Sequence, residues 1–464
     1  MDRVSRQPDV GESSFGSALP SETPIITHED LDRARDRLAI NRARSSNNWS
    51  LRLLRIFWLL IGPGVLVFLG ENDAPSMLSY AATGAQFGIG FFLPFVVLTF
   101  AMGFVVQEMT LRLGAVTHRG HAELIFDRFG RFWGFFAMGD LVLGNFLTLV
   151  TEFIGIRAGL GYFGIPPLVS VGGAVVVVLI IAMTGRYWTW ERITLALAVF
   201  NGLFIPAALL SHPHWSSIGH AFVTWSPLVG GMNSNTLLLL VADIGATVTP
   251  WMLFFQQSSV VDKGLQPRDI KAGRLDSALG SALAALFAIA AIIATAPLFT
   301  HGINSSSFQA ANFAQALVPW IGRTGSTLFA LGIFEAGLVA AITISTSSAY
   351  AFGEVLHSGH SLNRPWREAI PFYVVLLLSA GLAAALVLIP NAPLEYIILL
   401  VNVIAVLAMP PALVFLLLLV NDPKVMGRHR NGPWANLFAV AVTVFLVLVG
   451  LFYGITSVFP HLIG

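Results

Sequence analysis

The stretch GPGVLVFLGENDAPS, residues 62–76, decides the fold class of this chain. It is an apolar run interrupted by Glu71, Asn72 and Asp73 and followed by Pro75. Proline removes a backbone donor and clashes with the turn before it, so a helix through this stretch has to break. Inside a membrane, the freed backbone groups must be satisfied by protein or must line a polar cavity. The stretch therefore predicts a membrane helix that breaks at a polar site.

A second stretch, DIGATVTPW at residues 243–251, has the same character. Pro250 falls near the middle of an apolar segment, and Asp243 lies close by. Interrupted segments at corresponding places in two halves of a chain are typical of transporters built from inverted repeats, which bind substrate at the repeat interface. The two stretches lie in the first and sixth apolar segments, as a five-plus-five repeat requires.

The composition excludes several classes of protein. Of the 464 residues, 55% are hydrophobic and 11% are charged, against roughly 25% charged in an average soluble domain. This excludes a disordered chain, a nucleic-acid binder and an ordinary water-soluble enzyme. The chain has 0 cysteines, so it has no disulfide framework, thiolate metal site or cysteine nucleophile.

Eleven apolar stretches are long enough to cross a lipid bilayer, which takes about 20 helical residues. They have helical length and no period-2 alternation, so we predict an all-α integral membrane protein with eleven transmembrane helices. The stretches are roughly 56–83, 88–116, 132–158, 166–184, 190–211, 235–261, 274–300, 324–353, 369–390, 393–420 and 434–459.

The positive charges indicate how the chain is oriented. Lys and Arg collect in the cytoplasmic loops of membrane proteins. Of the 26 Lys and Arg residues, only Arg157 and Arg323 fall in odd-numbered connections. The pattern predicts a multi-pass protein of the cell membrane with its N-terminus in the cytoplasm and its C-terminus outside.

The same segmentation gives the expected domain organisation. Residues 1–50 are polar, with no signal-peptide core, and predict a largely disordered cytoplasmic tail with a short helix over 29–44. Residues 51–464 predict one transmembrane transporter domain. Within that domain we expect repeat one at about 51–212, repeat two at about 233–421 and an extra helix at about 434–459.

Acidic residues at mid-membrane depth indicate the charge of the substrate. A charged side chain at the bilayer centre costs about 2.5–3.5 kcal/mol on insertion scales, and Glu71 and Asp73 lie two residues apart, where they repel each other. A divalent cation between facing half-helices would offset both costs, and carbonyls at the breaks would add oxygen ligands. We therefore expect a divalent metal ion as the partner, and no nucleic acid.

These residues, with short motifs along the chain, resemble the Nramp family of divalent-metal transporters. The motifs are GPG at 62–64, TGAQFG at 83–88, QEM at 107–109, RLG at 112–114, AELI at 122–125 and GATV at 245–248. The resemblance covers nearly the whole chain after residue 50. It implies a LeuT-like five-plus-five inverted repeat plus one extra helix, with helices 1 and 6 broken. It also implies a transporter that is no enzyme and needs no cofactor.

The resemblance also implies a set of metal ligands. They are Asp73, Ser76, Thr249, Asn402 and the backbone carbonyls of Gly70 and Ala246. Ser76 and Thr249 stand where the family has Asn and Met, and Asn402 stands where it usually has Gln. Every ligand is then a hard oxygen, which suits Mg²⁺, Ca²⁺ and Mn²⁺. The loss of the Met thioether is similar to the Nramp-related magnesium transporters.

Four further polar residues are secondary candidates for the metal site: Asp243, Glu71, Asn72 and Glu152. Asp243 is either an added ligand for a hydrated metal or a carboxyl paired with a neighbouring helix. Of Glu71 and Asn72, we expect one to face the site. Glu152 either pairs with Arg157 or serves an outer gate, which we favour, or it contacts the metal.

Proton coupling is not expected from this sequence. The family's proton relay includes a His after the sixth-helix Pro and an acidic pair in the third helix. Trp251 and Leu149 stand at two of these positions, and His is the side chain whose ordinary pKa best suits such a relay. We therefore predict a secondary transporter that imports Mg²⁺ or Mn²⁺ by alternating access without proton influx.

Two alternatives remain open at this point. One is a carrier of a small organic cation or amino acid on the same fold. The other is a membrane sensor or scaffold that transports nothing. No motif indicates an oligomeric state.

Overall fold

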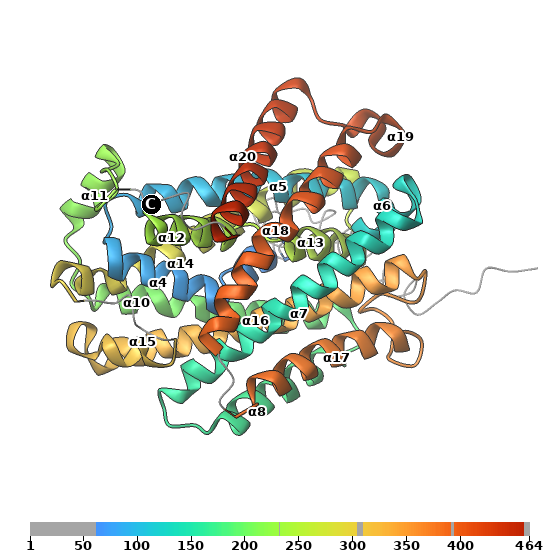
Figure 1. Ribbon diagram of the computed structural model, residues 1–464. Coiled ribbons are helices and arrows are strands. Elements are labelled where there is room, and N and C mark those ends of the chain that lie inside the picture. The colour runs from blue at the N-terminus through green and yellow to red at the C-terminus, as the bar shows by residue number, and fades with distance from the viewer. Residues whose placement is uncertain (1–61, 232, 304–309, 391–393, 459–464) are drawn as a thin grey trace, which may run out of the picture.

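A computed structural model describes residues 62–231, 233–303, 310–390 and 394–458, and this part of the chain is helical without β-strands. The predicted tail at 1–50, with its helix over 29–44, lies outside the described residues, and so does the side chain of Asn402. Figure 1 shows the helices as one bundle, with α6 and α19 at one end and α11 and α15 at the other.

The helices follow one another in an order that matches the predicted stretches. The α-helices and 3₁₀-helices are α3 Pro63–Glu71, α4 Ala74–Phe87, α5 Phe92–Thr117, α6 His121–Phe129, α7 Arg131–Gly161, α8 Pro167–Ala182, α9 Tyr187–Ala198, η1 Val199–Leu203, α10 Phe204–Leu209, α11 Trp215–Thr224, α12 Ser234–Gly245, α13 Pro250–Asp262, η2 Pro267–Asp269, α14 Ile270–Thr300, α15 Ala310–Ala316, α16 Val318–Val355, α17 Ile370–Val387, α18 Leu394–Asn421, α19 Pro423–Met426, η3 Gly427–His429 and α20 Pro433–Val458. Each of the eleven predicted stretches overlaps at least one of them.

The first predicted break lies between α3 and α4. Helix α3 ends at Glu71, and α4 begins at Ala74 with Pro75 in its first turn. Proline suits this position because the first backbone N–H groups of a helix have no intrahelical partner. The Asp73 carboxylate accepts a 2.9 Å hydrogen bond from the Ser76 N–H and so caps the new helix. The local sequence therefore ends one helix and starts the next.

The second predicted break lies between α12 and α13. Helix α12 ends at Gly245, and α13 begins at Pro250 with Thr249 as its extended N-cap residue. The residues between them, 246–249, are mostly buried. At both proline-containing stretches, one helix ends and the next begins inside the bundle.

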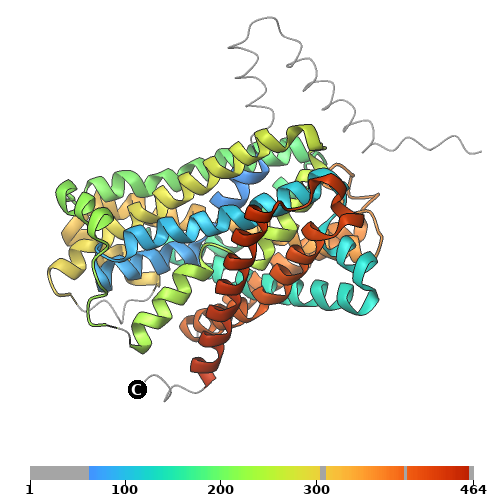
Figure 2. The same ribbon diagram turned by 90° about the horizontal axis from the view of Figure 1, so that it is seen from above.

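The core of the bundle is built around α16 and α14. Helix α16 packs along α7, and α14 packs along α3 and α4. The approach of α16 to α7 is close, because a Cβ at Gly337 would lie 2.9 Å from the Glu152 carbonyl oxygen. Small residues allow membrane helices to approach in this way. Figure 2 shows α18 and α20, in red, crossing one side of this core.

Eight helical segments of the described chain are long and apolar enough to cross a membrane, and a ninth results if the bent pair 408–421 and 423–429 counts as one span. Helix α8 is apolar but shorter. Many large apolar side chains on the outer faces of the helices are exposed, such as Val223 at 86% and Leu168 at 71%. The chain is therefore an all-α protein with many apolar spans and a lipid-compatible surface.

Candidate metal site

A small cavity lies where the two breaks meet. Its volume is about 50 Å³, and its walls come from α4, α7, α12, α18 and the residues before α13. The lining residues are Asp73, Pro75, Ser76, Ser79, Thr148, Thr151, Ala242, Gly245, Ala246, Thr249 and Val401. Four of the predicted ligand positions, Asp73, Ser76, Ala246 and Thr249, therefore meet at one cavity.

Asp73 supplies the charge of this cavity. It is 3% exposed and lies outside regular helix, directly before the start of α4. One carboxylate oxygen, Oδ1, is held by the Ser76 N–H. The cap fixes the orientation of the side chain, and the Asp73 carboxyl also lies next to the Glu152 carboxyl.

Thr249 joins the second break to the first. Its hydroxyl donates a 2.8 Å hydrogen bond to Oε2 of Glu71. Glu71 is fully buried, and its second carboxylate oxygen has no hydrogen-bond partner. Of the neighbours Glu71 and Asn72, it is Glu71 that faces the breaks, because the Asn72 amide turns away and donates to the Ala284 carbonyl oxygen of α14 at 3.0 Å.

Glu152 reaches the first break from α7. Its Oε2 accepts a 3.1 Å hydrogen bond from the Ala74 N–H, and its Oε1 has no hydrogen-bond partner. The Glu152 carboxyl also lies next to that of Asp73. Arg157 does not pair with Glu152 but donates to the Val387 carbonyl oxygen at 3.1 Å. The structure thus contradicts the ion pair with Arg157 and places Glu152 beside Asp73 and the first break, outside the residues that line the cavity.

Asp243 is engaged elsewhere. Its Oδ1 accepts a 2.7 Å hydrogen bond from the Ser79 hydroxyl, and its Oδ2 accepts one of 3.0 Å from the Thr83 hydroxyl. Asp243 is fully buried and is absent from the cavity lining given above. The two hydrogen bonds hold α12 against α4, so in this conformation the carboxylate is paired with the neighbouring helix.

The two predicted carbonyl ligands differ in their surroundings. Ala246 lines the cavity, but its carbonyl oxygen accepts a 3.1 Å hydrogen bond from the Tyr80 hydroxyl. Gly70 is not among the lining residues, and a Cβ there would lie 3.1 Å from the Thr343 Oγ1 and 3.2 Å from the Trp251 ring. Gly70 therefore allows the end of α3 to pack tightly against α13 and α16.

The donor atoms at the cavity are all oxygens. In the described part of the chain, no three His, Cys, Asp or Glu side chains come together as a metal-binding group. A metal here would be held by carboxylate, hydroxyl and carbonyl oxygens, together with water. Such ligands suit hard divalent cations.

Three polar lining residues were not predicted from the sequence: Ser79, Thr148 and Thr151. Ser79 lies three residues after Ser76, on the same face of α4. Thr148 and Thr151 are spaced in the same way on α7 and precede Glu152. Helical spacing from Ser76 could have found Ser79, and helical spacing from Glu152 could have found Thr148 and, from it, Thr151.

Charged residues hold the first turn of α3. The Asp276 carboxylate of α14 accepts hydrogen bonds from the N–H groups of Gly62, Gly64 and Val65 at 2.9, 2.7 and 3.2 Å. Beside it, Lys263 and Glu191 form an ion pair at 2.9 Å in which both side chains are 0% exposed. Burial lowers the pKa of the Lys263 ammonium, and the Glu191 carboxylate counteracts part of that shift. This end of α3 is thus anchored to α14, α9 and the residue after α13.

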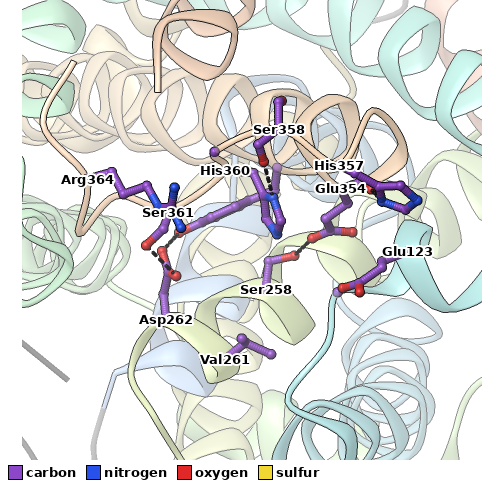
Figure 3. Close-up of a pocket in the computed structure, with 13 residues that line it drawn as sticks. Glu123, Ser258, Val261, Asp262, Glu354, His357, Ser358, His360, Ser361 and Arg364 are labelled. Carbon is purple, nitrogen blue, oxygen red and sulfur yellow. Dashed lines mark hydrogen bonds between the residues drawn. The ribbon is translucent and has the colours of Figure 1, made fainter. Parts of the chain in front are cut away.

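A larger cavity of about 290 Å³ lies at the end of the bundle near α6, where α13 and α16 end (Figure 3). Its carboxylates already have protein donors. Glu354 accepts from the Ala122 N–H at 3.0 Å and from the Ser258 hydroxyl at 2.5 Å. Asp262 accepts from Ser361 and Tyr350 at 2.8 and 2.7 Å. These contacts tie the helix ends together, so the smaller cavity at the breaks is the stronger candidate for binding.

Comparison with protein families gives one match over most of the chain. The model of the family described as natural resistance-associated macrophage protein-like, Nramp, matches residues 64–456. The divalent metal cation transporter MntH of Pediococcus pentosaceus is 27% identical over 420 residues, 85% of this chain and 92% of that protein. The MntH of Brucella suis is 26% identical over 456 residues, 94% of this chain and 96% of that protein.

Solved structures share the fold. The manganese transporter of Eremococcus coleocola, crystallised with an aromatic bis-isothiourea compound, superposes with a TM-score of 0.70 at 20% identity and covers 88% of each chain. A Na⁺-coupled sialic acid symporter superposes with a TM-score of 0.56 at 13% identity, over 93% of this chain and 95% of that one. At these identities the likeness establishes the fold alone.

Proposed function

The chain belongs to the Nramp family, and from that membership we propose that it is a secondary transporter that imports a divalent metal cation, Mg²⁺ or Mn²⁺, by alternating access. The MntH relatives are divalent metal cation transporters by name, and the Eremococcus protein is a manganese transporter. These relatives support a membrane transporter of divalent metal and speak against an enzyme.

The observation that carries the proposal is the meeting of the two breaks at one acidic cavity. Asp73, Ser76 and Thr249 line it, and Glu71 is hydrogen-bonded to Thr249 beside it. A cavity must offer roughly 10–15 Å³ for each water, so about 50 Å³ admits a metal ion with part of its hydration shell. Mg²⁺ keeps several waters when it binds to proteins.

The choice of Mg²⁺ or Mn²⁺ rests on the ligand types. Thr249 and Ser76 offer hydroxyls, Asp73 a carboxylate and Ala246 a carbonyl. Asn402 of α18 and the Gly70 carbonyl complete the proposed ligand set. No thioether is included, so the site lacks the ligand that favours softer transition metals. Glu71 and Glu152 raise the negative potential and disfavour a substrate carboxylate.

We propose the following topology for the transporter. Eleven helices cross the membrane, with the spans of α3–α4 and α12–α13 broken, as repeat one at about 51–212, repeat two at about 233–421 and the extra helix at about 434–459. The tail at 1–50 lies in the cytoplasm with the α6 end of the bundle, and the C-terminus lies outside. This orientation follows from the distribution of Lys and Arg.

Alternating access requires the cytoplasmic end to open after the metal has bound. The contacts that close it in this conformation are those of Asp276 with the first turn of α3 and the buried pair Lys263–Glu191. Their release would let α3 move away from α14 while α4 stays bound to α12 through Asp243. The two halves of the first span can thus move separately about the break.

Metal uptake into proteoliposomes tests the proposal, with the internal pH followed at the same time. We expect saturable uptake of Mg²⁺ and Mn²⁺ that responds to membrane potential and does not acidify the lumen. If neither metal is taken up, the proposed function is contradicted. Metal-dependent acidification of the vesicle lumen would instead contradict only the proposal that transport is not coupled to protons.

A further inference from the structure

A buried carboxylate on α16 is not used by the metal site. Glu335 is 4% exposed, and its Oε1 accepts a 3.2 Å hydrogen bond from Asn201 Nδ2. Its Oε2 has no hydrogen-bond partner. Among the described residues, the only side chain found hydrogen-bonded to this carboxyl is Asn201. A lone carboxylate in such a place is costly unless a proton or a cation neutralises it.

Asn201 brings the carboxylate to the break of α3. It lies in η1 and is fully buried. Its Nδ2 also lies 3.4 Å from the carbonyl oxygen of Leu69, and its Oδ1 has no hydrogen-bond partner. Leu69 belongs to the last turn of α3, where carbonyl oxygens lack helical partners and carry partial negative charge. The Glu335 carboxyl of α16, the Asn201 amide of η1 and the Leu69 carbonyl of α3 thus meet in the interior of the bundle.

The Asn201 side chain can turn either its amide nitrogen or its amide oxygen toward Glu335 and the Leu69 carbonyl. Rotation by a half-turn about its last torsion exchanges the nitrogen and the oxygen, which have nearly the same shape. The Asn201 oxygen would then lie about 3.2–3.4 Å from Glu335 Oε1 and Leu69 O. Oxygens this close repel each other unless a small cation lies between them.

From this geometry we propose that Glu335, Asn201 and the Leu69 carbonyl form a second cation site, which binds one monovalent ion of the size of Na⁺. The site holds one carboxylate and two neutral oxygens, so a single positive charge balances it. The close spacing of the oxygens favours a small ion.

The second site is linked to the metal site through two residues of backbone. Leu69 and Glu71 both lie in the last turn of α3. An ion at the Leu69 carbonyl would hold this turn against α16 and η1, and Glu71 would then face Thr249 in a fixed orientation. The coupling between the two sites rests on the proposed function. The binding of Na⁺ itself does not, because it does not depend on which substrate is carried.

Thermal unfolding of the purified full-length protein in Na⁺ tests the proposal. N-methyl-D-glucamine replaces Na⁺ to keep the ionic strength constant, and divalent metal is left out. The melting temperature is measured at an alkaline and at a mildly acidic pH. We expect a rise in melting temperature of a few degrees that saturates with Na⁺. Glu335→Gln, which keeps the size of the side chain, should abolish the rise, and Asn201→Ala should weaken it.

A matched control separates the site from general salt effects. Asp140→Asn removes a carboxyl from α7, another long apolar helix, and should keep the wild-type response to Na⁺. A Na⁺ response that survives in Glu335→Gln would overturn the proposal. Stabilisation by acid with no response to Na⁺ would also overturn it, because Glu335 would then hold a proton. Metal uptake measured on the same samples shows independently whether the proposed transport function holds.

Discussion

The Thr249 hydroxyl donates a 2.8 Å hydrogen bond to Oε2 of Glu71, which joins the N-cap residue of α13 to the last residue of α3. The two residues are 178 positions apart. One lies at each break, so this contact closes the cavity in which Asp73 and Ser76 lie. The electrostatics of the cavity therefore depend on both halves of the chain.

Replacing Glu71 by Gln tests its role as a source of negative potential. The amide oxygen can still accept from Thr249, so the local structure should stay while one negative charge is lost. We expect the dissociation constant for Mn²⁺ to rise by about tenfold, or about 1.4 kcal/mol. Isothermal titration of the purified protein measures it. The control Glu123→Gln, on α6, should bind as wild type, and an unchanged constant in Glu71→Gln would show that Glu71 does not act on the metal.

Replacing Thr249 by Met tests which residue sets the metal preference. A thioether favours softer metals than a hydroxyl does, so the ratio of Mn²⁺ to Mg²⁺ affinity should rise by about tenfold. Competition between the two ions in uptake assays gives this ratio. Thr249→Ser keeps the hydroxyl and should keep the ratio. If Thr249→Met also keeps it, residue 249 does not contact the ion.

Replacing Asp276 by Asn tests the anchoring of α3. The amide offers one acceptor oxygen in place of two, so at least one N–H of the α3 first turn loses its partner. The chain has 0 cysteines, so Val65→Cys, at a position 5% exposed, gives a single reporter. Loss of a hydrogen bond to a charged group costs about 1.5–3 kcal/mol, and we expect the thiol to react at least several-fold faster in Asp276→Asn. Equal rates would mean that Asp276 does not hold this end closed.

His121 gives the protein a stability that depends on pH. It lies at the start of α6, and burial lowers its pKa from 6.5 to about 4, while Gln257 hydrogen-bonds to its Nδ1 at 2.9 Å. The unfolded chain binds a proton near pH 6.5 and the folded chain does not, so acidification favours unfolding in this window. Unfolding free energy should therefore fall between pH 6.5 and pH 4, by at most about 3 kcal/mol from this group.

The variant His121→Asn isolates that contribution. Its amide nitrogen can still donate to Gln257, but it does not titrate. Thermal unfolding of wild type and variant at several pH values should show a shallower dependence in the variant between pH 4 and 6.5. Parallel curves over the whole range would assign the pH dependence to other groups.

Much of the site was predictable because its signals are local. Pro75 and Pro250 mark where α4 and α13 begin, and both positions follow from the backbone chemistry of proline. Asp73 and Ser76 lie one helical turn apart, and the structure places both at the cavity. The resemblance then selected Ala246 and Thr249 from the second break.

The partners of the buried acids were not predictable, because they depend on how distant helices pack. Glu152 accepts from the Ala74 N–H, 78 residues away in sequence, instead of pairing with its near neighbour Arg157. Asp243 finds two hydroxyls on α4, 160 and 164 residues away. A charge pattern along one helix indicates that a buried acid needs a partner, but only the tertiary arrangement decides which one it finds.

The most direct test of the proposed metal site is uptake of radiolabelled Mn²⁺ into proteoliposomes that contain wild type or Asp73→Ala, with unlabelled Mg²⁺ as competitor. Among the residues that the structure describes, Asp73 is the one carboxylate that lines the cavity. We predict that the wild type accumulates Mn²⁺, that Mg²⁺ inhibits this uptake, and that Asp73→Ala folds normally but accumulates no metal above empty vesicles. Uptake by Asp73→Ala at a rate near that of wild type would contradict the assignment of the metal site to the two helix breaks.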